Sequence, residues 1–142
     1  MNQSIPEDLV DATWQEVSEF SEEKALREMN RLTKAQPALT AFVMARSEDL
    51  SHDARELGIY MLLVISRMFE KQFGKLKKAD IKTVRRLEEE CEDGDTTQPF
   101  VLRSVEDCLF DPADDGIKLT EEDQETLFAV MKVVIGVLAG AH

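Results

Sequence analysis

The sequence predicts an all-α protein, a single-domain bundle of about seven helices over residues 1–142. Apolar residues recur at helical spacing in one segment after another, and no segment alternates apolar and polar residues as a half-buried strand does. Segments 53–73 and 121–139 are apolar over most of their circumference. Because such a helix belongs inside a domain, we expect these two helices to be central.

The first of these central helices is apolar from Leu57 to Ile65, apart from Gly58 and the amphipathic Tyr60. Ser51 precedes it as an N-cap, and a glycine follows it as a left-handed C-terminal residue. Its apolar residues then thin to one stripe, formed by Met68, Phe69 and Phe73. We therefore expect this helix to emerge from the core toward its end.

Capping residues and prolines in the N-terminal third of the sequence predict three further helices. Ser4 to Glu7 forms a capping-box pattern with proline in the first turn, Ser21 is the next N-cap, and Pro37 ends one helix and starts another. The predicted buried stripes are Val10, Trp14 and Val17 in the first helix, Ala25, Leu26, Met29 and Leu32 in the second, and Leu39, Phe42 and Val43 in the third.

Capping residues and a proline in the C-terminal half of the sequence predict the remaining helices. Asp80 is the cap of a fifth helix, Pro99 lies in the first turn of a sixth, and Thr120 to Asp123 forms a capping box before the last. The narrow stripe of the fifth helix is Ile81, Val84, Leu87 and Cys91.

The charge of the chain is acidic and unevenly distributed. The formal net charge is −12, which argues against a nucleic-acid or anionic-membrane partner. Residues 67–86 nevertheless hold eight basic and two acidic residues, a net charge of +6 that leaves −18 elsewhere. This run is either a solvated helix end and loop or a docking patch for an acidic surface, such as a second copy of the chain.

Two cysteines do not make a disulfide scaffold. The N-terminal residues contain neither a basic region nor an apolar run, so we expect no signal peptide. The apolar segments 57–65 and 127–141 are too short and too closely flanked by acidic residues to span a bilayer. We predict a cytoplasmic protein without a membrane partner.

Residues 111–122 lie between two predicted helices and resemble a degenerate EF-hand calcium loop. Asp111, Asp115, Gly116 and Glu122 occupy loop positions 1, 5, 6 and 12. Positions 3 and 8 hold alanine and lysine, and no second loop pairs with this one. A capped turn explains the same residues, so we expect no bound metal and retain Asp111, Asp115 and Glu122 only as weak candidate ligands.

The acidic run 88–95 resembles the Glu-x-x-Glu and Glu-x-x-Asp pairs of all-α nucleotide pyrophosphohydrolases. In that family, carboxylates one turn apart on two helices hold magnesium against a nucleotide phosphate. Here Glu89 and Glu92, with Glu90 and Asp93, overlap on one segment. The alternatives are a solvated helix end and a contact with a basic partner.

His52, with Asp49 and Glu56, could supply metal ligands from one helix face, but the only other histidine is the last residue. We therefore interpret His52 as a surface residue. Gly136 and Gly140 lie one turn apart on the last helix and allow close approach of another helix, within the chain or across a dimer.

The sequence contains no persuasive catalytic set and predicts no cofactor. The preferred hypothesis is a non-enzymatic acidic helical protein that acts through protein–protein association, including a homodimer. The apolar area for a dimer would come from the glycine-containing face of the last helix or from the stripe ending at Phe73. The alternative is a divalent-metal-binding protein or a metal-dependent enzyme acting on nucleotides.

Overall fold

The computed structural model describes residues 4–90, 98–110 and 119–140, and within those residues it contains seven helices and no strand. The predicted all-α fold is confirmed. The helices are α1 (Glu7–Ser18), α2 (Glu22–Ala35), α3 (Pro37–Ser47), α4 (His52–Phe73), α5 (Ile81–Glu90), α6 (Pro99–Phe110) and α7 (Glu121–Ala139). None of these described helices is long and apolar enough to cross a membrane.

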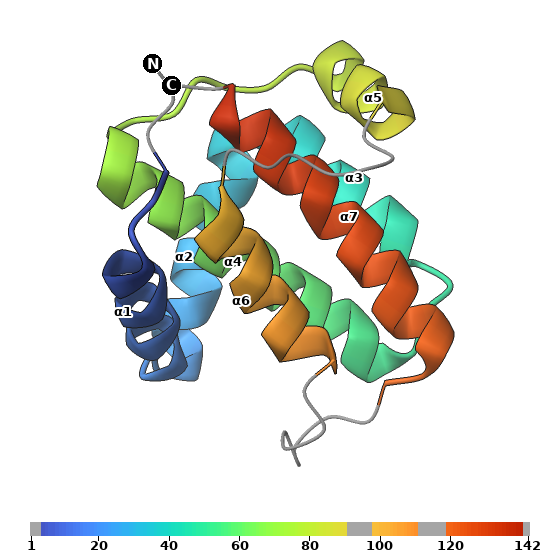
Figure 1. Ribbon diagram of the computed structural model, residues 1–142, viewed down its shortest axis with the longest axis horizontal. Helices are drawn as coiled ribbons and strands as arrows, with labels where there is room; N and C mark the ends of the chain where they lie inside the picture. The colour runs from blue at the N-terminus through green and yellow to red at the C-terminus, as the bar shows by residue number, and fades with distance from the viewer. Residues whose placement is uncertain (1–3, 91–97, 111–118, 141–142) are drawn as a thin grey trace.

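Helices α4 and α7 form the centre of the bundle, as their apolar circumference predicts. Helix α4 crosses the middle of the molecule behind α6 and α7 (Figure 1) and packs against α1, α2, α3 and α7. Helix α7 packs against α3, α4, α5 and α6. Leu62 and Ile65 have no exposed surface. Helix α3 also belongs to this centre, because it contacts both α4 and α7 and fully buries Leu39 and Val43.

Gly58 marks the point where the three central helices approach one another. A Cβ atom at this position would lie 3.0 Å from Cδ2 of Leu127 on α7 and 3.9 Å from Cγ1 of Val43 on α3. The absence of a side chain therefore allows α4 to pack closely against α7.

The N-terminal ends of α4 and α7 are joined by their capping residues. The Ser51 hydroxyl accepts a hydrogen bond from the Ala54 amide at 3.2 Å and donates one to Asp123 Oδ2 at 3.0 Å. Asp123 completes the predicted capping box with Thr120. One pair of polar side chains thus satisfies amides of both helices and fixes their starts together.

The predicted capping box at Ser4 is wrong. Helix α1 begins at Glu7, with Pro6 as N-cap and no side-chain cap. The reason is a distant contact: Ile5 is fully buried, and its amide donates to Oε1 of Gln98 at 2.7 Å. The segment before α1 is held against the core, and Ser4 is exposed and does not cap the helix.

The prediction that α4 emerges from the core toward its C-terminal end is wrong. Met68 and Phe69 have no exposed surface, and Phe73 is half-buried. The chain after α4 returns across the bundle because Gln36 holds it: its Nε2 donates to the Lys77 carbonyl at 2.8 Å and its Oε1 accepts from the Ala79 amide at 3.0 Å. The stripe is therefore unavailable for a dimer contact.

Gly74 ends α4 with a positive φ of 83°, as expected, and its amide donates to the Glu70 carbonyl at 2.8 Å. Its ψ of −155° places it outside the left-handed helical region that the sequence predicts. The glycine thus sends the chain into an extended return, which directs the loop toward Gln36.

Candidate functional site

Most of the residues proposed as metal ligands in segments 88–95 and 111–122 lie outside the part of the chain that the structure describes. Glu122 is exposed in the first turn of α7, and Glu89 and Glu90 are exposed at the end of α5. The other candidates lie outside the described residues: Glu92, Asp93, Asp111 and Asp115. The resemblance to a calcium loop and the overlapping acidic pairs therefore remain sequence interpretations.

His52 contacts one exposed carboxylate and belongs to no larger cluster among the described residues. Its Nε2 lies 3.1 Å from Oε1 of Glu56, and the two side chains are 73% and 68% exposed. Asp49 is exposed in the turn before α4. Among the described residues, no group of three or more histidine, cysteine, aspartate or glutamate side chains could hold a metal ion.

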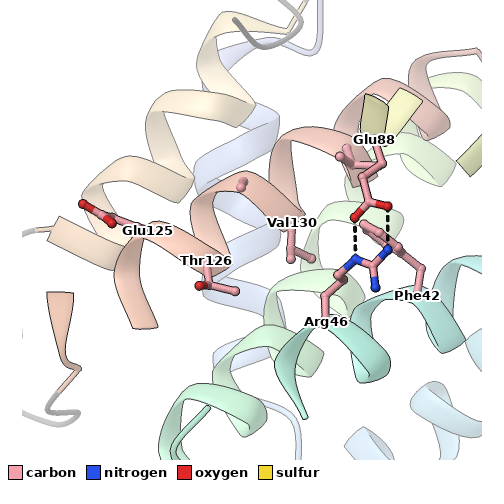
Figure 2. Close-up of a pocket in the computed structure, with 8 residues that line it drawn as sticks. Phe42, Arg46, Glu88, Glu125, Thr126 and Val130 are labelled. Atoms are coloured by element: carbon pink, nitrogen blue, oxygen red, sulfur yellow. Dashed lines mark hydrogen bonds and ion pairs between the residues drawn. The ribbon is translucent and has the colours of Figure 1, made fainter. Parts of the chain in front are cut away.

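A pocket of about 340 Å³ lies between α3, α5 and α7 (Figure 2). Arg46 Nη2 donates to Oε1 of Glu88 at 2.6 Å, and its Nε donates to the other carboxylate oxygen. The guanidinium also lies 5.4 Å from the ring centroid of Phe42. The opposite wall is formed by α7 and includes the apolar residues Val130 and Val133.

This pocket has the electrostatics of a structural ion pair. The hydrogen bonds from Arg46 lower the pKa of Glu88, and those of Glu88 raise the pKa of Arg46. Both groups are therefore held charged, whereas acid–base catalysis needs a pKa close to the working pH. Glu125, the other carboxylate at the pocket, extends away from the pair in Figure 2. We assign Arg46 and Glu88 the role of joining α3 to α5.

Part of the predicted basic docking patch is used inside the molecule. Arg67 donates to both carboxylate oxygens of Glu16, at 2.8 and 3.2 Å, and Lys71 pairs with the same carboxylate. These hydrogen bonds, first from Arg67 and then from Lys71, lower the pKa of Glu16 to about 2. The guanidinium also lies 5.1 Å from the ring of Phe20. Arg67 and Lys71 therefore connect α4 to α1.

The remaining basic residues form an exposed stretch, here called the basic segment: Lys75, Lys77, Lys78, Lys82, Arg85 and Arg86. In the part of the chain that the structure describes, none of them lies within ion-pair distance of a carboxylate. Ile81, predicted on a buried stripe, is 42% exposed among them because it is the first residue of α5. This segment therefore combines an excess of positive charge with an exposed apolar side chain.

The predicted buried stripe of α2 is also largely uncovered. Only Leu32 is buried, Ala25 and Met29 are half-buried, and Leu26 is 64% exposed. Among the described helices, the main packing partners of α2 are α3 and α4. Its N-terminal half therefore leaves apolar side chains at the surface.

A groove of about 330 Å³, here called the α2–α4 groove, lies along this half of α2. Its apolar lining residues are Ala25, Leu26, Met29, Ile59, Tyr60 and Leu63. The only charged lining residues are Glu22 and Glu56, so its rim is acidic. An apolar centre with a polar rim is the arrangement found in protein interfaces.

The glycine-containing face of α7 has a partner within the chain. A Cβ atom at Gly136 would lie 3.9 Å from Cδ1 of Leu87 on α5, and Gly140 faces only backbone atoms of its own helix. Gly136 thus supports the intramolecular alternative, because its nearest neighbour is a side chain of α5. The α2–α4 groove was not predicted from the sequence. Seven of the 14 residues of α2 are charged, which already indicates a peripheral helix.

Comparison with protein-family models, with curated proteins and with solved structures found no match. The groove, the basic segment and the ion pairs are therefore interpreted from their own chemistry.

Proposed function

We propose that this chain is a non-enzymatic acidic helical protein that acts through protein–protein association at the α2–α4 groove. The exposure of Leu26 beside the apolar wall formed by Met29 and Ile59 carries the proposal. Covering a leucine side chain completely is favourable by about 1.5–3 kcal/mol. A partner that fills the groove gains most of this contribution at Leu26 and less at its half-buried neighbours.

The ion pairs support a non-enzymatic role. Glu16 and Glu88 have lowered pKa values because arginine side chains hydrogen-bond to them. Their charges stabilise contacts between helices, and neither carboxylate is poised to exchange a proton near neutral pH. The lowered pKa values of Glu16 and Glu88 therefore follow from their structural role in joining helices.

The proposal includes self-association as a homodimer, because two-fold dimers are the commonest closed assemblies of soluble proteins. The net charge of −12 favours a protein partner over a nucleic acid or an anionic membrane. The cytoplasmic location predicted from the sequence belongs to the same proposal.

Site-specific photo-crosslinking in cells that produce the protein tests this proposal. A photoreactive residue in place of Leu26 is expected to give a discrete adduct heavier than the 16.1 kDa chain. The matched control carries the same group in place of Glu106, which is exposed on α6. Adducts of equal yield at both positions, or none at Leu26, would contradict association at this groove.

A further inference from the structure

We propose that the α2–α4 groove binds the basic segment of a second copy of this chain, in a two-fold symmetric dimer. The inference rests on the proposed function, because it takes the groove to be an association surface. It identifies the occupant of the groove and the part of the partner that enters it.

Charge complementarity identifies this occupant. The charged residues that line the groove are both acidic, Glu22 and Glu56. The basic segment is exposed and has no carboxylate within ion-pair distance among the described residues. Arg67 and Lys71, the other basic residues of this region, are already paired with Glu16. The basic segment is thus the part of residues 67–86 that is free to meet an acidic rim.

The two surfaces also carry complementary apolar groups. Leu26 is 64% exposed beside the groove, and Ile81 is 42% exposed within the basic segment. Exposed ion pairs orient a contact more than they strengthen it. Leu26 and Ile81 provide the apolar area that the affinity requires, and the flanking charges fix which surfaces meet.

The groove and the start of the basic segment lie toward opposite ends of α2. The groove follows the first half of α2, from Glu22 to Met29. The basic segment begins at the other end, where Gln36 holds Lys77 and Ala79. At 1.5 Å per residue, Leu26 and Gln36 are about 15 Å apart along the helix axis.

In a two-fold symmetric dimer, the symmetry that places the groove of one copy on the basic segment of the other also forms the reciprocal contact. Both contacts form at the same time, and neither surface remains open. Because this arrangement uses each surface once per copy, assembly stops at two chains.

Reciprocal charge reversal tests the contact. One variant carries Glu22→Lys and Glu56→Lys at the rim, and the other carries Lys78→Glu and Lys82→Glu in the basic segment. All four side chains are exposed, so circular dichroism is expected to show unchanged helix content. Mass is measured by light scattering coupled to size exclusion at tens of micromolar protein.

The wild-type chain is expected at twice its 16.1 kDa mass, about 32 kDa. Each variant alone is expected near 16 kDa, with dimer affinity reduced at least tenfold, because like charges now face each other across both contacts. An equimolar mixture of the two variants is expected to return to the dimer mass. In that mixture every positive surface meets a negative one.

The control variant, Glu106→Lys with Asp107→Lys, makes the same change in net charge as the rim variant. Both residues are exposed on α6, which lies in front of α4 in Figure 1, whereas α2 lies behind it. This variant is expected to retain the wild-type mass.

A wild-type monomer at this concentration, a dimer that both variants preserve, or a mixture that stays monomeric would each overturn the inference. These failures are distinct from failure of the proposed function. A crosslink from Leu26 to a different protein would retain the groove as an association surface and reject the second copy as its occupant.

Discussion

Leu62 lies in the middle of α4 with no exposed surface, among side chains from the helices that surround it. We predict that Leu62→Ala lowers the free energy of unfolding by about 2–5 kcal/mol, because it removes apolar contacts and leaves a cavity. Urea unfolding measures this change. The matched variant Met44→Ala, at a 48% exposed position outside the α2–α4 groove, is expected to change stability by about 0.5 kcal/mol or less. Equal effects at the two sites would contradict the central place of α4.

Glu16 links stability to pH through its two basic partners. Its pKa falls from 4.5 to about 2 in the folded chain because Arg67 and Lys71 hydrogen-bond to it. A lowered carboxyl pKa contributes stability that is complete above the unfolded value and is lost as pH falls through the folded value. Hence the contribution of Glu16 is present at neutral pH and disappears between about pH 4.5 and about pH 2.

We predict that Glu16→Gln lowers stability at pH 7 by about 1 kcal/mol, a modest value because water screens a partly exposed ion pair. The difference from the wild-type chain should close as pH falls toward 2. Denaturant unfolding at several pH values measures both quantities. A difference that is constant from pH 7 to pH 2 would show that Arg67 and Lys71 do not hold this carboxylate in its charged form.

At the scale of the helices, two glycines offer a matched test of packing. Alanine is favoured over glycine in a helix interior by about 1 kcal/mol. At Gly58 the added Cβ would lie 3.0 Å from the fully buried Leu127 side chain, whereas at Gly136 the nearest atom is 3.9 Å away on Leu87. We therefore predict that Gly58→Ala destabilises the protein by about 1 kcal/mol or more, because the contact between α4 and α7 must open.

Gly136→Ala is predicted to stabilise the protein by about 0.5–1 kcal/mol, since 3.9 Å is an ordinary contact and the helix gains propensity. Thermal unfolding of both variants compares the two sites. A gain at Gly58 would mean that Leu127 can move aside, and a loss at Gly136 would place α5 closer to α7 than the structure does.

The helices and their centre could be predicted because the signals are local. Thr120 and Ser51 act as caps through amides within three residues of them, and an apolar circumference around Leu62 requires cover whatever its neighbours are. These features depend on spacing along the chain alone. The predictions of the caps at Thr120 and Ser51 and of the central position of α4 were correct for that reason.

The errors come from contacts between distant residues. Ile5 is buried because Gln98, 93 residues away, accepts its amide. The end of α4 stays covered because Gln36 holds Lys77. The groove has the same origin: the apolar spacing around Leu26 predicts a stripe, but whether another helix covers that stripe depends on where the other helices pack. No local pattern contains that information.

At the scale of the whole molecule, the distribution of charge decides how copies meet. A chain with a net charge of −12 repels its copies over the range of the ionic atmosphere. In the proposed dimer, contacts between the basic segment and the acidic rim act over a few ångströms and attract. The two effects have different ranges, so salt affects them at different concentrations.

We therefore predict that dimer affinity passes through a maximum as salt concentration rises. At about 0.01 M ionic strength the screening length is about 30 Å, and the repulsion between whole copies acts in full. Near 0.1 M the screening length falls to about 10 Å. This length screens the repulsion between whole copies but leaves the close pairs of Glu22 and Glu56 with lysines. Near 1 M it falls to about 3 Å, and these pairs weaken as well.

Sedimentation equilibrium of the wild-type chain at these three salt concentrations measures the effect. The rim variant Glu22→Lys with Glu56→Lys is the control, because its weakened association should lack the maximum. An affinity that rises steadily to 1 M salt would indicate purely apolar association and contradict charge pairing across the interface. A maximum near 0.1 M that the rim variant abolishes would assign the pairing to the α2–α4 groove.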